Sequence, residues 1–165
     1  MGFSVTLSHI IMVIGSVILA STFSAYSFYT GGVVQNSMMQ NARDVAEETS
    51  LQLEIVYATL DNSTSPSHFV IYVKNIGWTP VYDYTYLDIY VGEYGRAILY
   101  SYNQTATVGG GQFNVTDANG DGVWECRETA VIKVFPESAV TGVMFEAKVV
   151  PFRGIGSSYL FPASP

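Results

Sequence analysis

The first 42 residues, from Met1 to Ala42, contain no Asp, Glu, Lys or Arg. That absence excludes an ordinary surface helix, which carries charged residues on its outer face. Cysteine is nearly absent as well, since Cys126 stands alone in the chain. No intrachain disulfide can therefore form, and stability must come from packing, metal binding or assembly.

Basic and catalytic residues are also scarce. Lys and Arg number 7 against 14 Asp and Glu, which gives a net charge of −7. Nucleic-acid binding needs clustered Lys and Arg, so this composition excludes nucleic acid as a partner. His9 and His68 are the only histidines, and no Ser-His-Asp, Cys-His or phosphate-loop pattern occurs. We therefore expect no catalytic residue and no enzymatic activity.

What the N-terminal region does contain is a continuous apolar run from Leu7 to Tyr29. A helix of about 20 apolar residues crosses the hydrocarbon core of a bilayer. The pattern predicts a transmembrane helix over residues 1–30. It lacks a basic n-region, so we expect it to be retained and not cleaved as a signal peptide. Small residues that recur at multiples of four let a partner helix approach closely, and the general abundance of small residues in membrane helices is the alternative explanation. The small residues at this spacing are Ser8, Ser16, Ala20 and Ser24.

Gly31-Gly32 interrupts the apolar run, and a helical pattern resumes after it. Apolar residues recur on one face up to Ala46, with charged residues on the others. This pattern predicts a helical stalk over residues 31–50, formed either by the first helix continuing or by a second helix. A simple linker is the alternative.

Residues 51–165 read as a mainly β domain. Apolar and polar residues alternate with period two over short runs separated by turn residues. We predict an immunoglobulin-like antiparallel β-sandwich of about seven strands. The expected strands lie near residues 51–57, 69–75, 87–91, 97–102, 130–135, 143–150 and 159–161.

Three Asn-X-Ser/Thr tripeptides lie in polar, turn-like contexts of this domain. They begin at Asn62, Asn103 and Asn114. Such sequons are N-glycosylation acceptors on extracytoplasmic surface. Together they favour a single-pass topology with the N-terminus inside and the C-terminal domain outside.

Residues 117–128 match the twelve-residue calcium loop D-x-N-x-D-G-x5-E. The predicted oxygen ligands for a structural Ca²⁺ ion are Asp117, Asn119, Asp121, the Val123 carbonyl, Glu125 and Glu128. The flanking segments are not helical, so the loop would sit on a β scaffold. A polar hairpin turn without metal is the alternative.

Tyrosines gather between residues 82 and 90. In a strand, Leu87, Ile89 and Val91 would face the core, and the tyrosines would face outward. Because Tyr is enriched at protein interfaces, this face is a candidate for partner binding or dimerisation. The general preference of Tyr for strands is the alternative explanation. The predicted interface residues are Tyr82, Tyr84, Tyr86 and Tyr90.

The opening Met1-Gly2-Phe3-Ser4, followed by one apolar helix, resembles the archaellum (archaeal flagellum) accessory protein F family. The segment VIYVKNIG, residues 70–77, fits that family's β-sandwich. A sibling, accessory protein G, shares the architecture. The resemblance implies a single-pass protein of the archaeal cell membrane at the base of the archaellum. Its outer domain would bind the surface-layer protein and act as a stator, as a homodimer or homo-oligomer or together with accessory protein G.

Two other functions remain open from the sequence. One is a filament-forming pilin- or archaellin-like subunit, whose helix would leave the membrane and pack in a filament core. The other is a calcium-binding adhesion module that needs neither the surface layer nor the motor.

Overall fold

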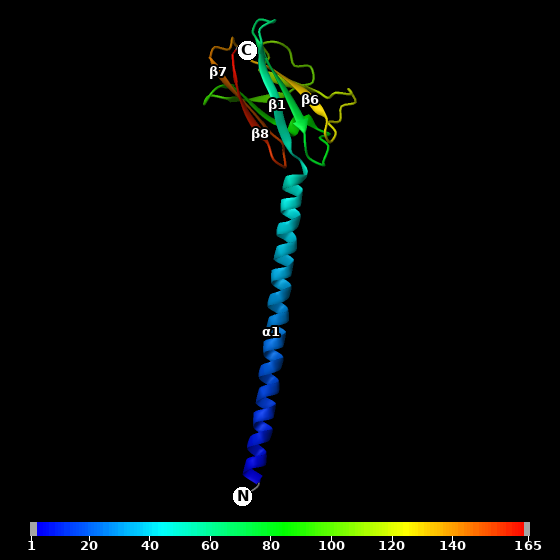
Figure 1. Ribbon diagram of the computed structural model, residues 1–165, viewed down its shortest axis with the longest axis vertical. Coiled ribbons are helices and arrows are strands. Elements are labelled where there is room, and N and C mark those ends of the chain that lie inside the picture. The colour runs from blue at the N-terminus through cyan, green and yellow to red at the C-terminus, as the bar shows by residue number, and fades with distance from the viewer. Residues whose placement is uncertain (1–2, 164–165) are drawn as a thin grey trace. The chain divides into compact units, whose positions relative to one another are not determined.

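A single helix, α1, runs from Phe3 to Ser50 (Figure 1). The structure is a computed structural model that describes residues 3–163, so Met1-Gly2 of the resemblance lies outside the described residues. The helix passes through Gly31-Gly32 without a break, so the stalk continues the first helix. Each helical glycine costs only about 1 kcal/mol, and no proline occurs before Pro66.

The polar side chains of α1 bond back to its own backbone. Hydroxyl groups of Ser16, Thr22 and Thr30 donate to carbonyls three or four residues earlier, at 2.7–3.0 Å. This arrangement keeps the hydroxyls satisfied where the surroundings are apolar. In the described part of the chain, one helix is long and apolar enough to cross a membrane. Its candidate span is Thr6–Ala46, and none of its most apolar window is buried.

The chain divides into two units, residues 1–45 and 46–165. Within its described residues, the second unit holds eight strands and one short 3₁₀ helix, η1 (Tyr84–Tyr86). The strands are β1 (Leu53–Asp61), β2 (His68–Asn75), β3 (Asp88–Glu93), β4 (Ile98–Tyr102), β5 (Gln112–Thr116), β6 (Thr129–Phe135), β7 (Met144–Val150) and β8 (Ser157–Pro162).

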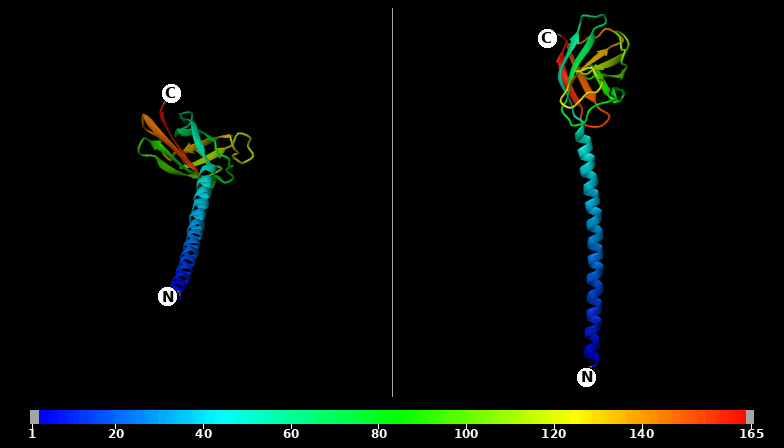
Figure 2. Two further views of the ribbon diagram at one scale, coloured as in Figure 1. Left: turned by 60° about the horizontal axis from the view of Figure 1, so that its bottom comes forward. Right: turned by 90° about the vertical axis from the view of Figure 1, so that its right-hand side faces the viewer.

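The strands follow the order β1-β2-β6-β5-β4-β3-β7-β8, and β1 and β8 lie side by side (Figure 2). Every pairing is antiparallel except β4 with β5, which is parallel. The sheet therefore curls into a β-sandwich that is almost a closed barrel. The predicted fold class, an apolar helix followed by a mainly antiparallel β-sandwich, is confirmed.

Strand β5 is the one that the sequence did not predict. It follows Gly109-Gly110-Gly111 and offers only Phe113 and Val115 as alternating apolar residues. Such a short run after three glycines resembles a loop. Its pairing with β6, from Gln112 with Phe135 to Thr116 with Val131, makes it a strand.

Three phenylalanines hold the two sides of the sandwich together. Phe69 of β2 packs edge-on against Phe145 of β7 and Phe161 of β8, with ring centroids 5.3 and 6.0 Å apart. The Phe145 and Phe161 rings lie 5.8 Å apart. All three are buried, and such aromatic pairs add to the stabilisation from apolar burial.

A buried amide, Asn75 at the end of β2, joins three segments of the domain. Its Nδ2 donates to the carbonyl of Thr79 at 2.9 Å, and its Oδ1 accepts from the Gly77 N–H at 3.0 Å. Its backbone N–H donates to the Glu128 carbonyl, and its carbonyl accepts from the Arg127 N–H. Asn75 thereby fixes the 76–79 turn against the loop that precedes β6.

The same turn receives the chain where it enters the domain. The Trp78 and Thr79 N–H groups donate to the Ser50 carbonyl at 2.7 and 3.1 Å. This satisfies a carbonyl that the end of α1 leaves without an intrahelical partner. A Cβ at Gly77 would lie only 2.5 Å from the Ser50 oxygen, so this close approach requires glycine.

We predict that Asn75→Ala lowers the free energy of unfolding by about 2–3 kcal/mol, because it leaves buried backbone groups without partners. Asn75→Asp is the matched variant: it keeps the acceptor for Gly77 but loses the donor to Thr79, and we expect a loss of the same order. Denaturant unfolding of the full chain in detergent measures both. A loss below about 0.5 kcal/mol for the alanine variant would contradict this role.

Candidate functional site

The predicted calcium loop, residues 117–128, connects β5 to β6 and is anchored in the core at one side chain. Trp124 is fully buried, and its Nε1 donates to the Glu128 carbonyl at 3.0 Å. Its backbone forms a two-way bridge with Val81 at 3.0 Å. Gly122 has a φ of 83°, the left-handed conformation that the sixth position of the pattern requires of glycine.

Glu128 closes this loop with its carboxylate. Its Oε1 accepts from the backbone N–H groups of Ala118 at 2.9 Å and Asn119 at 3.2 Å. Its Oε2 accepts from the Glu125 N–H at 2.8 Å. Glu128, the last residue of the pattern, therefore links the start of the loop at residues 118–119 to Glu125 near its end.

Other predicted ligands also accept backbone N–H bonds. The Asp117 Oδ2 accepts from Gly122 at 3.2 Å, and the Asp121 Oδ1 accepts from Val123 at 2.8 Å. Burial works to raise the pKa of the Asp117 carboxyl, but hydrogen bonds from backbone N–H groups, including that of Gly122, outweigh it and leave the pKa below its ordinary value. The loop thus favours the charged form of Asp117 without any ion.

Within residues 3–163, no group of three His, Cys, Asp or Glu side chains is arranged to hold a metal ion. Calcium therefore remains a prediction. The donor set of carboxylate, amide and carbonyl oxygens is the type that Ca²⁺ selects. Binding would require Glu128 to exchange backbone N–H donors for the ion.

If calcium binds, it stabilises the folded domain by mass action. Isolated extracellular sites bind at roughly 10⁻⁴–10⁻³ M. At ten times the dissociation constant the gain is about 1.4 kcal/mol, on the order of 5 °C in melting temperature. We expect Glu128→Gln to remove this response and Glu54→Gln, on an exposed strand position, to retain it. Calorimetry with calcium and with chelator measures the shift, and identical melting curves for the unmodified chain would refute the site.

The tyrosine segment differs from the prediction at its N-terminal end. Leu87, Ile89 and Val91 are buried as expected, but residues 84–86 form η1 and not a strand. Asp83 caps this turn, because its Oδ1 accepts from the Thr85 N–H at 2.9 Å and from its hydroxyl at 2.6 Å. The turn breaks the alternation that the prediction assumed.

Tyr84 is therefore wrongly placed in the predicted interface: the turn rotates it into the core, where it is 7% exposed. Tyr82 and Tyr86 are 72% and 60% exposed, and Tyr90 is half-buried on β3. The interface at these three tyrosines stays a prediction. The sequence did not identify Phe152, an exposed residue whose ring lies 5.4 Å from that of Tyr86.

The Tyr84 hydroxyl is buried, and no hydrogen-bond partner for it lies among the described residues. Burial of the phenol, with smaller repulsion from Asp117, raises its pKa well above the ordinary value. Its ring packs edge-on against Tyr102 with centroids 5.8 Å apart. The ring thus contributes to packing, and the hydroxyl adds a desolvation cost.

Tyr84→Phe should therefore not destabilise the domain, and we expect a gain of about 1 kcal/mol, because it removes an unsatisfied polar atom and keeps the ring. Tyr102→Phe, at a half-buried neighbour, serves as the comparison. Equilibrium unfolding measures the free energy of unfolding of the two variants and of the unmodified chain. A loss of more than about 1 kcal/mol for Tyr84→Phe would mean that the hydroxyl has a bonding partner.

The three sequon asparagines occupy different settings. Asn62 lies in the β1–β2 turn, Asn103 in the β4–β5 connection and Asn114 within β5. Cys126 lies within that loop and is exposed.

The described residues thus form a long, exposed apolar helix and a β-sandwich. The sequence matches the archaeal-type flagellin family over residues 2–161, so the chain belongs to that family. It is a family of structural components of the archaellum. No curated protein matches the sequence.

Solved structures share the fold. The archaellum periplasmic stator protein FlaG from Sulfolobus acidocaldarius is 24% identical, with a TM-score of 0.53, and the match covers 67% of this chain and 99% of that one. A chain of the archaellum periplasmic stator protein complex FlaF and FlaG from the same organism gives the same identity and TM-score, with 67% of this chain and 88% of that one covered. The archaeal flagellum of Methanospirillum hungatei strain JF1 is 14% identical, with a TM-score of 0.57, over 96% of this chain and 93% of that one.

Proposed function

We propose that this protein is a membrane-anchored stator subunit of the archaellum, of the accessory protein F or G type. Its N-terminal helix spans the cell membrane, and its β-sandwich lies outside and holds the surface-layer lattice. The observation that carries this proposal is the exposed apolar surface of α1, which changes in character along its length.

The first part of α1 has the composition of a bilayer span. Large apolar side chains from Leu7 to Tyr29 are more than half exposed, including Ile11, Phe23 and Phe28. Water would make this exposure costly, at about 25 cal/mol per Å², and lipid removes that cost. Tyr26 and Tyr29 suit the membrane–water interface at the end of this part.

Helix α1 as a whole is longer than a bilayer span requires, so its second part extends beyond the membrane. Forty-eight helical residues extend about 70 Å, whereas the hydrocarbon core is about 30 Å thick. Beyond Gly32, exposed Val34, Met38 and Met39 alternate with polar residues such as Asn36 and Gln40. Such a mixed surface suits contact with a partner helix better than contact with lipid.

A shallow apolar groove runs along one face of α1 and crosses the boundary between the two parts. Its lining residues are Phe23, Tyr26, Ser27, Thr30, Gly31, Val34, Gln35, Met38, Met39 and Ala42. Gly31 has open space where a Cβ would lie, so a second helix can approach closely there. This supports association through the helix, with a second copy or with the other accessory protein.

The β domain carries the charge. Arg43 and Asp44 cancel within residues 1–45, so the whole net charge of −7 resides in residues 46–165. A soluble, acidic outer domain suits contact with an envelope lattice through polar groups or divalent cations. The exposed Tyr82 and Tyr86 give that contact an aromatic component.

The test is chemical cross-linking and affinity purification of the tagged full chain from archaeal envelopes. We expect recovery of a surface-layer protein and archaellum components. Met38→Asp should abolish association through the helix without releasing the protein from the membrane. Asn36→Asp, on the opposite side of α1, is the matched control. Failure to recover any envelope partner would contradict the stator function.

A filament-forming archaellin-like subunit is the second candidate. It is supported by the match to the Methanospirillum hungatei flagellum over 96% of this chain, which includes α1. In that case the whole helix would be covered by identical neighbours. Helical filaments of the purified full chain, seen by electron microscopy together with removal of Met1, would favour this candidate over the stator.

A further inference from the structure

We propose that Asn62 is the one asparagine of the three sequons that carries an N-linked glycan in the folded protein. The donor would be an oligosaccharide linked to a polyprenyl phosphate or diphosphate. The proposal rests on the outside location of the β domain, which is part of the proposed function. The three sequons are equivalent in sequence, and their surroundings in the fold separate them.

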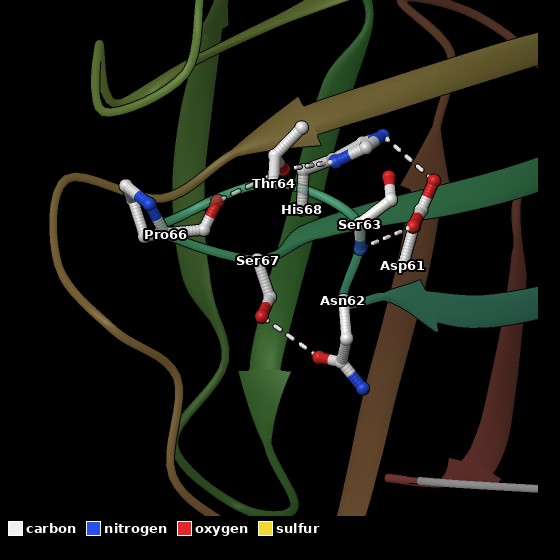
Figure 3. A network of polar contacts seen from close by, with 7 residues as sticks. All are labelled: Asp61, Asn62, Ser63, Thr64, Pro66, Ser67 and His68. Atoms are coloured by element: carbon white, nitrogen blue, oxygen red, sulfur yellow. Dashed lines mark hydrogen bonds and ion pairs between the residues drawn. The ribbon is translucent and has the colours of Figure 1, made fainter.

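Asn62 lies exposed in the turn between β1 and β2 (Figure 3). Its Oδ1 accepts a hydrogen bond from the Ser67 hydroxyl at 2.7 Å. Its Nδ2 makes no hydrogen bond to the described residues and points away from the turn. A sugar on Nδ2 would leave the bond to Ser67 in place and extend into solvent.

The turn that carries Asn62 is held in place by the buried side chain of His68. This buried ring stacks on Phe135 at 5.2 Å, and its Nδ1 lies 2.9 Å from the Thr64 hydroxyl. Asp61 accepts from the Ser63 N–H at 2.8 Å and lies 3.6 Å from the other nitrogen of His68. These contacts hold Thr64, the third residue of the sequon, against the buried His68 and leave Asn62, the first residue, exposed to solvent.

Asn103 is half-buried, and its amide is engaged on both sides. Its Nδ2 donates to the Gln112 Oε1 at 2.7 Å, and its Oδ1 accepts from the Thr105 N–H and hydroxyl at 3.0 Å each. A sugar ring at this nitrogen would have to fit beside the Gln112 side chain, which already contacts it. The fold therefore disfavours a glycan at Asn103.

Asn114 lies within β5, opposite Lys133 of β6. Its Oδ1 is fully buried and has no hydrogen-bond partner in the described part of the chain. The residue is half-buried, and a glycan here would have to extend from an amide whose oxygen is enclosed within the paired β5 and β6 strands. The fold therefore disfavours a glycan at Asn114.

The transfer itself balances simply. The Asn62 Nδ2 forms a bond to C1 of the first sugar and loses one proton to a base of the transferase. The bond from C1 to the lipid phosphate oxygen breaks, and the polyprenyl phosphate or diphosphate leaves. The product is a bulky, solubilising group on the surface, as expected for an N-glycan.

Two experiments test the proposal. In the first, the purified full chain in detergent is incubated with an archaeal oligosaccharyltransferase and its lipid-linked donor, and glycopeptides are mapped by mass spectrometry. We expect one glycan, on the peptide that contains Asn62. Asn62→Gln should abolish the mass increase, whereas Thr64→Ser, which keeps the sequon, should retain it. Occupancy of Asn103 or Asn114, or no modification by an enzyme that modifies a synthetic Asn-Ser-Thr peptide, overturns the assignment.

In the second experiment, the same mapping is done on the chain isolated from an archaeal host. A glycan on Asn62 in the cell supports both the acceptor assignment and the outside location. Modification of Asn62 by the purified enzyme but not in the cell would support the acceptor assignment and contradict the outside location, and with it the proposed stator function. Failure of the acceptor assignment and failure of the proposed stator function are thus distinguishable.

Discussion

The exclusion of apolar surface from water is the constraint on which the rest of this molecule depends. The β domain meets it internally, with side chains of β2, β7 and β8 interlocked around Phe69. Helix α1 cannot meet it alone, because none of its most apolar window is buried within the chain. The protein is therefore complete only when lipid or other helices cover α1. Membership of the archaeal-type flagellin family, a family of structural components of the archaellum, agrees with this requirement.

Within the β domain, a few polar groups decide how the loops are placed. Asn75 fixes the 76–79 turn and the end of the 117–128 loop, and Glu128 closes that loop from the other side. Asp83 and His68 act similarly at η1 and at the β1–β2 turn. In each case one side chain determines which neighbours face solvent. The exposed positions of Tyr86 and Asn62 are consequences of these buried or capping contacts.

The helix, the fold class and most strands were predictable, because long apolar runs and period-two alternation report burial directly. Strand β5 was not, because its apolar pattern is too short to separate from a loop. Tyr84 was misplaced because hydrogen bonds that Asp83 accepts from Thr85 cap a 3₁₀ helix where a strand was expected, and alternation does not reveal capping. The loop pattern at residues 117–128 was visible in the sequence. Spacing alone did not reveal that Glu128 binds three backbone N–H groups.

The adjacency of β1 and β8 limits how other molecules can join this domain. The Leu53 N–H donates to the Ile155 carbonyl, and the Ile155 N–H donates to the Leu51 carbonyl, so the two ends of the sheet protect each other where the chain enters. At this point the backbone groups are already paired, and the packing of β8 against β1 hinders a foreign strand from adding to either edge. Copies of the domain at high concentration are then less prone to cross-β association. Association with other molecules is left to side chains and to α1, whose contacts can be specific and reversible.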